Sequence, residues 1–382
     1  MSNEQTKAQE PQSLPPFACR HSPDLAELLQ RLKISVAITT YQGGKILLIS
    51  PKDRDTIGQL PRNFDTPMGM ALKGDKLAVA LKNEVLVLAN DDRLCKDYPN
   101  KPEHYDAMFM PRGSYFTGQV AMHDLGWGNE GELYGVNTNF SCLVKMTHDH
   151  SFQPIWQPKF ISELTPEDRC HLNGMAMYEG KPTYVTALGE CDEPKAWSAG
   201  RATGGILMEV ESGEIITRGL GMPHSPRIHQ DRLFVLESAN GEVCEIDRKT
   251  GKRTVIQKYP GFVRGLSCYG DYLFVGMSKL RSRGSIGGMD PLPIQQTGQP
   301  LQAGFKVIHI PTGGTMGELI YAATCEEIYE IQVLPGMQTP NVINHYKDLH
   351  QKALSLPDKT YWAQSPEELA PETTEEAPTT VA

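Results

Sequence analysis

The chain has 382 residues, a formal net charge of −9 and a pI of about 5.7. An acidic chain without a Lys/Arg-rich block has no basic face, which argues against a nucleic-acid partner or an anionic membrane. No run of about 18 apolar residues occurs, and the polar N-terminus lacks an apolar signal core, so we expect a cytoplasmic protein. The eight cysteines are scattered without a CxxC pair and are expected to be free thiols.

The two ends of the chain differ in composition from its centre. We expect disorder over residues 1–20, a single folded domain over 21–350 and a C-terminal extension over 351–382, which is acidic and expected to be disordered from about residue 365. Near the start, DLAELLQRLK (24–33) has leucines at helical spacing and follows Ser22, a residue type that caps helices. We expect this helix to close one face of the domain.

Three predicted strands come next, ISVAITTYQ (34–42), KILLISP (45–51) and TIGQLPR (56–62), and then a pattern that repeats. Each copy couples one strand to another through a Gly/Asp turn. The copies are PMGMALKGDKLAVAL from Pro67, HDLGWGNEGELYGVNT from His123, HLNGMAMYEGKPTYVTAL from His171, HSPRIHQDRLFVLES from His224 and FVRGLSCYGDYLFVGMSK from Phe262. All-β repeats of about 40–50 residues are typical of propeller blades.

The last blade indicates how the ring closes. Beyond Thr324 only one clear strand follows, EEIYEIQVLPG (326–336), whereas the three N-terminal strands have no inner strand before them. One C-terminal strand plus three N-terminal strands makes a whole blade and removes the free edges. The sequence therefore predicts an all-β, six-bladed β-propeller. An insertion rich in Gly, Pro and Gln (280–304) is predicted to be a long loop.

The candidate site lies where the inner strands begin, because these strands line the central channel. Three histidines fall at matching places in three consecutive repeats, and polar residues lie beside them. The set is His123, His171, Asn173, His224, Arg227, Arg264 and Glu327.

Two chemistries suit this set, and a structural role is the alternative to both. Neutral imidazoles converging from His123, His171 and His224 suit zinc, iron or manganese, with a carboxylate completing the shell. Without a metal, Arg227 and Arg264 would hold a carboxylate or phosphate while a histidine acts as acid or base. Polar residues at blade starts also satisfy backbone groups, and then the channel would carry no site.

We expect a small-molecule site for an anionic metabolite at the channel mouth. In its enzyme version, a metal-assisted hydrolase or lyase, His171 and Glu327 are catalytic, while Asn173 and the two arginines bind the ligand. The alternative is a non-catalytic propeller whose outer faces or 280–304 loop bind a partner protein. No GxSxG, HExxH or phosphate-loop motif is present, so the sequence leaves open whether the protein is an enzyme.

Seven segments, taken in order, resemble a family of bacterial conserved hypothetical proteins that carry a domain of unknown function. They are HDLGWG, CHLNGMA, YVTALGE, GMPHSPRIH, GFVRGLS, FVGMSK and EIYEIQVLPG. The resemblance covers about residues 20–345 and groups the His and Arg candidates without assigning them roles. A more distant likeness, to six-bladed gluconolactonase and regucalcin-type propellers, implies a divalent cation held by Glu, Asn and Asp. Asn173 matches that Asn, but no glutamate lies near Met68 to match the early Glu.

Overall fold

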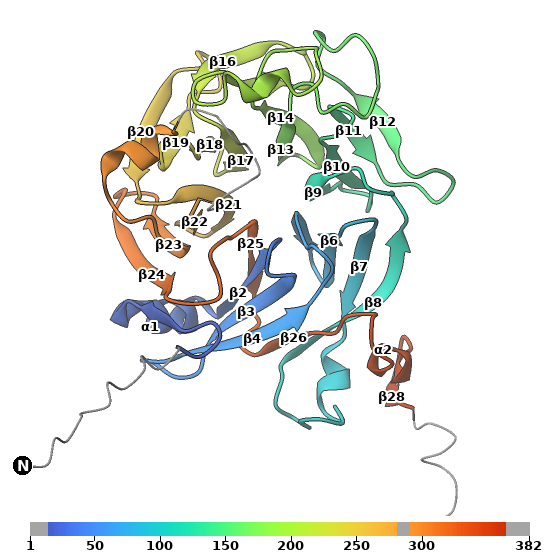
Figure 1. Ribbon diagram of the computed structural model, residues 1–382. Coiled ribbons are helices and arrows are strands. Elements are labelled where there is room, and N and C mark those ends of the chain that lie inside the picture. Colours follow the sequence, from blue (N-terminus) through green and yellow to red (C-terminus); the bar gives the residue numbers. More distant parts are fainter. Residues whose placement is uncertain (1–13, 281–290, 364–382) are drawn as a thin grey trace, which may run out of the picture.

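The computed structural model describes residues 14–280 and 291–363. Six antiparallel sheets stand like blades around a central channel (Figure 1). This confirms the predicted all-β, six-bladed propeller.

The first three sheets contain the N-terminal half of the chain. From the channel outward they are β25 (Glu330–Pro335), β2 (Ile34–Thr40), β3 (Lys45–Pro51), β4 (Ile57–Asn63); β5 (Met70–Lys73), β6 (Lys76–Ala80), β7 (Val85–Asn90), β8 (Ala107–Tyr115), β26 (Pro340–Val342); and β9 (Met122–Trp127), β10 (Leu133–Asn137), β11 (Cys142–Lys145), β12 (Gln153–Trp156). β26 adds to its blade in parallel with β8.

The other three sheets follow the same order. They are β13 (Leu172–Tyr178), β14 (Lys181–Ala187), β15 (Gly205–Glu209), β16 (Ile215–Leu220); β17 (Pro223–His229), β18 (Arg232–Glu237), β19 (Glu242–Ile246), β20 (Arg253–Lys258); and β21 (Phe262–Tyr269), β22 (Tyr272–Ser278), β23 (Gly304–His309), β24 (Thr315–Tyr321), β1 (Cys19–His21). Short 3-10 turns lie at η1 (Asp92–Cys95), η2 (Ala196–Ser198) and η3 (Pro293–Thr297).

The ring closes as the sequence predicts. β25 pairs antiparallel with β2, with Val36 opposite Val333, so one C-terminal strand completes the blade of three N-terminal strands. The Thr39 hydroxyl secures this junction, because it accepts a hydrogen bond from the Glu330 amide at 3.0 Å and donates one to the Met68 carbonyl at 2.7 Å. The bond to Met68 thereby ties the closing blade to the next blade, which begins at β5.

Helix α1 (Pro23–Leu32) confirms the predicted helix and lies at the rim between two blades (Figure 1). It buries Leu25, Leu28 and Leu29 in a core that includes side chains of β2, β3, β23 and β24. Ser22 occupies the N-cap position, but its hydroxyl accepts from the Glu318 amide at 3.0 Å instead of capping the helix. The helix therefore seals a gap between sheets.

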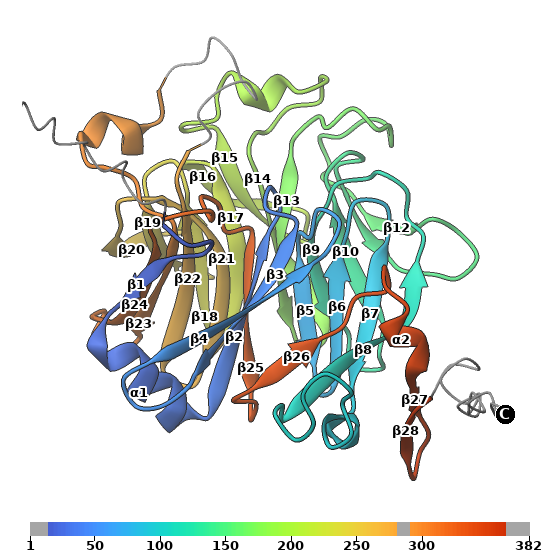
Figure 2. The ribbon, with the colours of Figure 1, turned by 60° about the horizontal axis from the view of Figure 1, so that its bottom comes forward.

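The ends of the propeller domain differ in part from the sequence prediction. Residues up to 20 are predicted to be disordered, yet β1 (Cys19–His21) pairs with β24 as a fifth strand. Beyond residue 350, the short helix α2 (Leu349–Lys352) leads into a hairpin of β27 (Ala353–Ser355) and β28 (Thr360–Trp362), seen at the edge of Figure 2. The rest of the two predicted disordered ends, and 281–290 of the predicted loop, lie outside the described residues.

Close packing of the inner strands explains the repeated glycines. At one matching position of the inner strands, glycine in one blade alternates with a polar residue in the next blade around the ring. A Cβ on Gly69 would lie 2.8 Å from the His123 carbonyl oxygen, and one on Gly174 would lie 3.0 Å from the Ser225 amide nitrogen. The backbones approach too closely for any side chain at these places.

The substitution Thr39→Val tests the closure. It would keep the shape of the side chain but leave the Glu330 amide and the Met68 carbonyl without their partner, so we expect the free energy of unfolding to fall by about 1 to 3 kcal/mol. Urea denaturation measures this. Thr254→Val, on the exposed face of β20, is the control and should change stability little. Equal stability of the two variants would contradict this role for Thr39.

Candidate functional site

Six residues, one from each blade, form a ring at the channel mouth, which we call the mouth ring. Four of them come directly after a residue whose backbone carbonyl accepts a hydrogen bond from a side chain of the preceding blade. In these bonds Thr138 donates to Leu172, Asn173 to Pro223, Ser238 to Val263 and Ser278 to Ile328. The mouth ring is Met68, His123, Asn173, His224, Arg264 and Tyr329.

This register corrects the sequence alignment of the three histidines. His123 and His224 occupy matching places, but the matching residue of the blade between them, which begins at β13, is Asn173. His171 lies two residues earlier, where its φ of 52° matches the φ of 51° at Ala121 and 48° at Met222. His171 therefore projects from the αL turn that precedes the inner strand and lies above the mouth ring.

His123 and His224 are held in the same way, and this fixes their tautomer. The Nδ1 of His123 lies 2.9 Å from the Ala121 carbonyl and 2.7 Å from the Thr138 hydroxyl, which already donates to Leu172. The Nδ1 of His224 has equivalent contacts, at 2.9 Å to the Met222 carbonyl and 2.8 Å to the Ser238 hydroxyl. Because these partners can only accept, Nδ1 carries the proton and Nε2 carries the lone pair.

His171 is oriented by a carboxylate. Its Nδ1 lies 3.0 Å from both carboxylate oxygens of Asp168, and its ring centroid is 4.3 Å from that of Trp197. The Trp197 indole in turn donates to the Asp168 carbonyl at 3.0 Å. A carboxylate on Nδ1 fixes the ring orientation and the tautomer, so that Nε2 is directed outward.

The three imidazoles surround a cation. The ring centroids of His123 and His171 are 5.0 Å apart, and the Arg264 guanidinium lies over the Tyr329 ring, 3.5 Å from its centroid. Burial, followed by the neighbouring His171 and Arg264, lowers the pKa of His123 well below its usual value. Burial and then Arg264 do the same to the pKa of His224. Both histidines are therefore neutral at pH 7.

Arg264 lacks a neutralising partner within the described part of the chain. No carboxylate there lies within 4.0 Å of its guanidinium. Beneath it, the Tyr329 hydroxyl is buried and has no hydrogen-bond partner among the same residues. Glu327, which the sequence assigns to catalysis, is 8% exposed and accepts from the Gln42 amide at 3.1 Å. The carboxylates of this region, Asp168 at His171 and Glu327 at Gln42, form no ion pair with Arg264, which is therefore a cation without a direct carboxylate partner among the described residues.

Two predicted ligand-binding residues have structural roles instead. Asn173 is 4% exposed, and its side chain donates to the Pro223 carbonyl at 3.0 Å and accepts from the Thr186 hydroxyl at 2.7 Å. Arg227 lies below the mouth ring, where it bridges blades. Asn173 thus bonds to two neighbouring groups within the protein, and Arg227 has no N–H group free for a ligand at the mouth.

We call the ion pairs of Arg227 with Asp124 and Glu330 the Arg227 network. Its guanidinium bonds both oxygens of Asp124 at 2.8 and 3.1 Å and one oxygen of Glu330 at 2.9 Å. Its remaining N–H groups donate to the carbonyls of Met175, Pro226 and Leu266. All five donors are engaged. Burial raises the pKa of Glu330 to about 7, an effect that Arg227 partly offsets.

Sequence reasoning missed the residues that orient the site. Asp168 and Trp197 lie in loops. The short spacing between Asp168 and His171 is the one sequence signal that could have suggested that these two side chains interact. Tyr329 lies immediately before β25, whose weak match to the repeat hid its place in the mouth ring.

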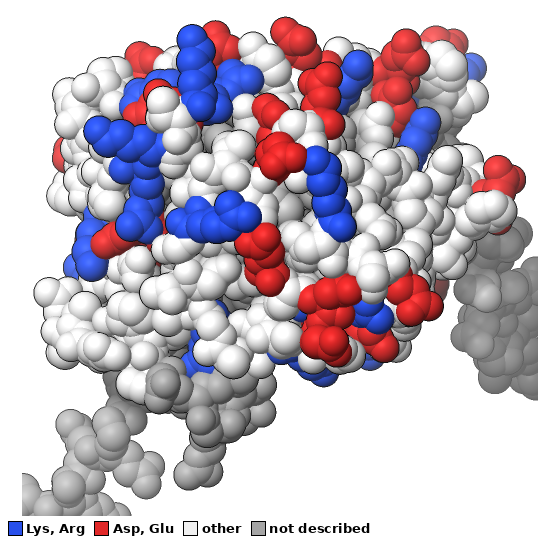
Figure 3. Space-filling model, turned by 90° about the horizontal axis from the view of Figure 1, so that it is seen from above, with Lys and Arg blue, Asp and Glu red and all other residues white. Residues whose placement is uncertain are grey.

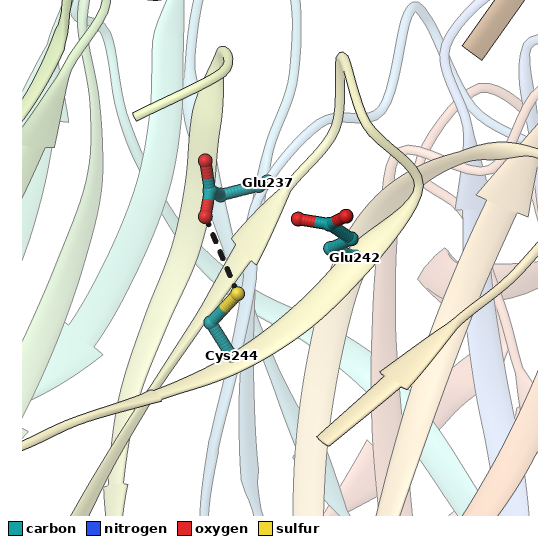
Figure 4. A group of neighbouring side chains, drawn as sticks. All are labelled: Glu237, Glu242 and Cys244. Carbon is teal, nitrogen blue, oxygen red and sulfur yellow. Dashed lines mark hydrogen bonds between the residues drawn. The ribbon is translucent and has the colours of Figure 1, made fainter. Parts of the chain in front are cut away.

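A second group of possible metal ligands lies elsewhere, in the blade of β17–β20. Ligand atoms of Glu237, Glu242 and Cys244 come within 4.8 Å of one another, the only such described group (Figure 4). Arg253 already bonds both oxygens of Glu237 at 2.7 Å, and Lys258 lies 3.2 Å from Glu242. The carboxylates thus have their own cations, and we assign no metal here.

The surface gives little further indication of a partner. The face in Figure 3 shows both basic and acidic side chains, with uncharged surface between them. Within the described ranges, no helix is both long enough and apolar enough to cross a membrane.

Comparison with known proteins places the chain in a family. Residues 23–343 match the model of a domain of unknown function, DUF4915. The chain belongs to this family. The resemblance to conserved hypothetical proteins is thereby confirmed, and no curated protein matches the chain.

Solved structures similar to the chain have low sequence identity. A protein of unknown function from Bacteroides caccae has 10% identity and a TM-score of 0.49, and the match covers 79% of this chain and 98% of that one. A catalytically inactive virginiamycin B lyase from Staphylococcus aureus, with quinupristin, has 13% identity and a TM-score of 0.40, covering 79% and 99%. Likenesses at this level carry no argument about activity.

Removing the Arg227 side chain should destabilise the fold. Arg227→Met leaves two buried carboxylates without a cation, so we expect the free energy of unfolding to fall by about 3 to 5 kcal/mol. The control is Arg232→Met, which breaks a partly exposed pair with Glu245 and should cost about 1 kcal/mol or less. Chemical denaturation of both variants measures the difference. Similar losses of unfolding free energy in the two variants would contradict a special stabilising role for the Arg227 network.

The tautomer assignment can be checked by NMR. In long-range ¹H–¹⁵N spectra at pH 7, we expect His123 and His224 to be neutral with the proton on Nδ1. Because their pKa values are lowered, both should remain neutral at pH 6. Titration of His123 and His224 with an ordinary pKa near 6.5 would contradict this assignment.

Proposed function

We propose that the channel mouth binds a small organic anion, with Arg264 as its anchor. The observation that carries this proposal is the guanidinium of Arg264, which is partly buried, stacked on Tyr329 and without a carboxylate partner among the described residues. Burying a charge is costly unless it is paired. A carboxylate, sulfate or phosphate group on a ligand would supply the missing charge and the oxygen acceptors that a guanidinium prefers.

The neutral histidines make this binding depend on pH. An anion on Arg264 cancels the positive field that helps to keep His123 and His224 unprotonated. Their pKa values should therefore rise in the complex, so that binding takes up protons. Since the complex holds more protons than the free protein, affinity should increase as the pH falls. A protonated imidazole would then donate from Nε2 to the bound anion.

His171 is the best-placed group for proton transfer. Asp168 holds its Nδ1–H, which leaves the Nε2 lone pair able to take a proton from a bound molecule. The nearby guanidinium would stabilise negative charge that develops on the molecule as the proton leaves. Such an arrangement suits proton abstraction in a lyase or activation of water in a hydrolase, which remain the two reaction classes we propose.

A metal-assisted version fits the residues less well. Anchored Nδ1 atoms are usual for metal-binding histidines, so the donor type suits zinc. However, the described ligand atoms of His123, His171 and His224 do not gather within 4.8 Å of one another. The charge of Arg264 also opposes a cation. We therefore derive no step through a metal.

Sulfate binding by Arg264→Gln tests the proposal. Sulfate keeps its charge across the pH range, so calorimetric titration of the natural protein should show tighter binding at pH 6 than at pH 8. Loss of the charged hydrogen bonds should weaken the affinity of the variant about 10- to 100-fold.

Arg112→Gln, which changes an exposed arginine of β8, is the matched control and should bind as the natural protein does. Equal affinity in Arg264→Gln would refute the anchor, while binding that requires added zinc would favour the metal version. Absence of any binding would favour the alternative of a protein-interaction propeller.

A further inference from the structure

The channel has a second compartment below the Arg227 network. A cavity of about 450 Å³, which we call the lower cavity, opens at the end of the channel opposite the mouth ring. Its volume is within the range of small-molecule sites, about 300–1,000 Å³. Each innermost strand, or the turn after it, contributes a polar or thiol side chain to the lining: Lys73, Asn129, Glu179, His229, Cys268 and Gln332.

The accessible surface of the lower cavity is polar. Apolar residues of the same strands, such as Met70 and Met175, are 1–2% exposed and pack in the cores between blades. Lys73 and Glu179 are exposed at the open end, and Gln332 is half-buried in the wall. A ligand that enters the lower cavity therefore meets hydrogen-bonding groups.

The cationic donors of the lower cavity are already engaged. Arg227 lines the inner end, and all five of its N–H groups bond to carboxylates or carbonyls of the protein. Lys73 donates its Nζ to the carbonyls of Gly128 and Asn129. Both cations therefore have acceptors within the protein, unlike Arg264 at the mouth.

Two side chains of the wall also use their donors within the protein. The His229 Nε2 lies 2.6 Å from the Gly270 carbonyl, which can only accept, so Nε2 carries a proton and Nδ1 is the acceptor of the neutral ring. The Gln332 Nε2 donates to the Val333 carbonyl at 2.9 Å, which leaves Oε1 as an acceptor. Neither acceptor has a hydrogen-bond partner within the described ranges.

The open end of the lower cavity adds further acceptors. Asn129 donates its Nδ2 to the Glu179 carbonyl at 3.0 Å, and its Oδ1 remains. The carboxylate of Glu179 forms neither an ion pair nor a hydrogen bond with another residue of the described chain. The groups left for a ligand are therefore mainly acceptors, so a ligand that fills the lower cavity has to supply hydrogen-bond donors.

From this lining we propose that the lower cavity binds an uncharged polyhydroxyl compound, such as a sugar. Hydroxyl groups donate to these acceptors and can accept the remaining N–H of Lys73. An anion would bring no donors and would face the Glu179 carboxylate, while an ammonium ligand would face the Lys73 ammonium. The site is distinct from the anion site at the mouth, because the Arg227 network lies between them.

Saturation-transfer NMR with a mixture of glucose, galactose, ribose, myo-inositol and trehalose tests this proposal, since the method detects weak binding. We expect at least one of these compounds to receive saturation from the natural protein, and its affinity is then titrated. Glu179→Ala and Gln332→Leu each remove acceptors from the lower cavity and should weaken that affinity about five- to tenfold. The matched controls Glu130→Ala and Gln299→Leu change exposed residues outside the lining and should bind as the natural protein does.

The two sites can fail separately. Arg264→Gln should leave sugar binding unchanged, and Glu179→Ala should leave sulfate binding at the mouth unchanged. Thermal melts identify which lower-cavity variants are folded, and one folded variant suffices for the test. The proposal is overturned if none of the five compounds receives saturation, or if a folded lower-cavity variant binds the sugar with unchanged affinity. It is also overturned if methylammonium binds more tightly than every sugar and loses this binding in Glu179→Ala.

Discussion

The buried pairing of one guanidinium with two carboxylates is the constraint on which the channel depends. Arg227 reaches Asp124 and Glu330, each 103 residues away in sequence, so one side chain joins three blades. Such charges are costly to bury, and only their mutual attraction together with the surrounding backbone hydrogen bonds offsets that cost. The inner strands must therefore hold their relative positions closely, which leaves the residues above and below them in fixed places.

Two arginines on neighbouring inner strands differ because of what surrounds them. Arg227 lies between carboxylates and carbonyls, and all of its N–H groups are hydrogen-bonded to them. Arg264, one blade further and one layer higher, lies on the Tyr329 ring and among imidazoles that cannot neutralise it. The chemistry proposed for the mouth follows from this difference, since burial and then the charge of Arg264 keep His123 and His224 neutral, and the unpaired guanidinium favours an anion.

The sequence predicts the fold better than the site because the two depend on different kinds of information. Turn glycines and alternating strands recur in each blade, so the blade count and the ring closure are visible locally. The partners of Arg227 and Asn173 lie in other blades, and no local pattern reveals that they are occupied. His171 was misaligned because the sequence does not show that its backbone adopts the αL turn two residues before Asn173. Asp168 and Trp197 come from loops without repeat character.

The closing strand also has a consequence for how the protein is made. Thr39 and Glu330 meet across the closure although 291 residues separate them. At translation rates of about 5–20 residues per second, roughly 15–60 s pass between synthesis of these two residues. During that time the nascent β2 lacks its neighbour, and its fully buried apolar residues have one open edge. Until the last blade emerges from the ribosome, this edge of β2 is therefore open to pairing with a wrong strand.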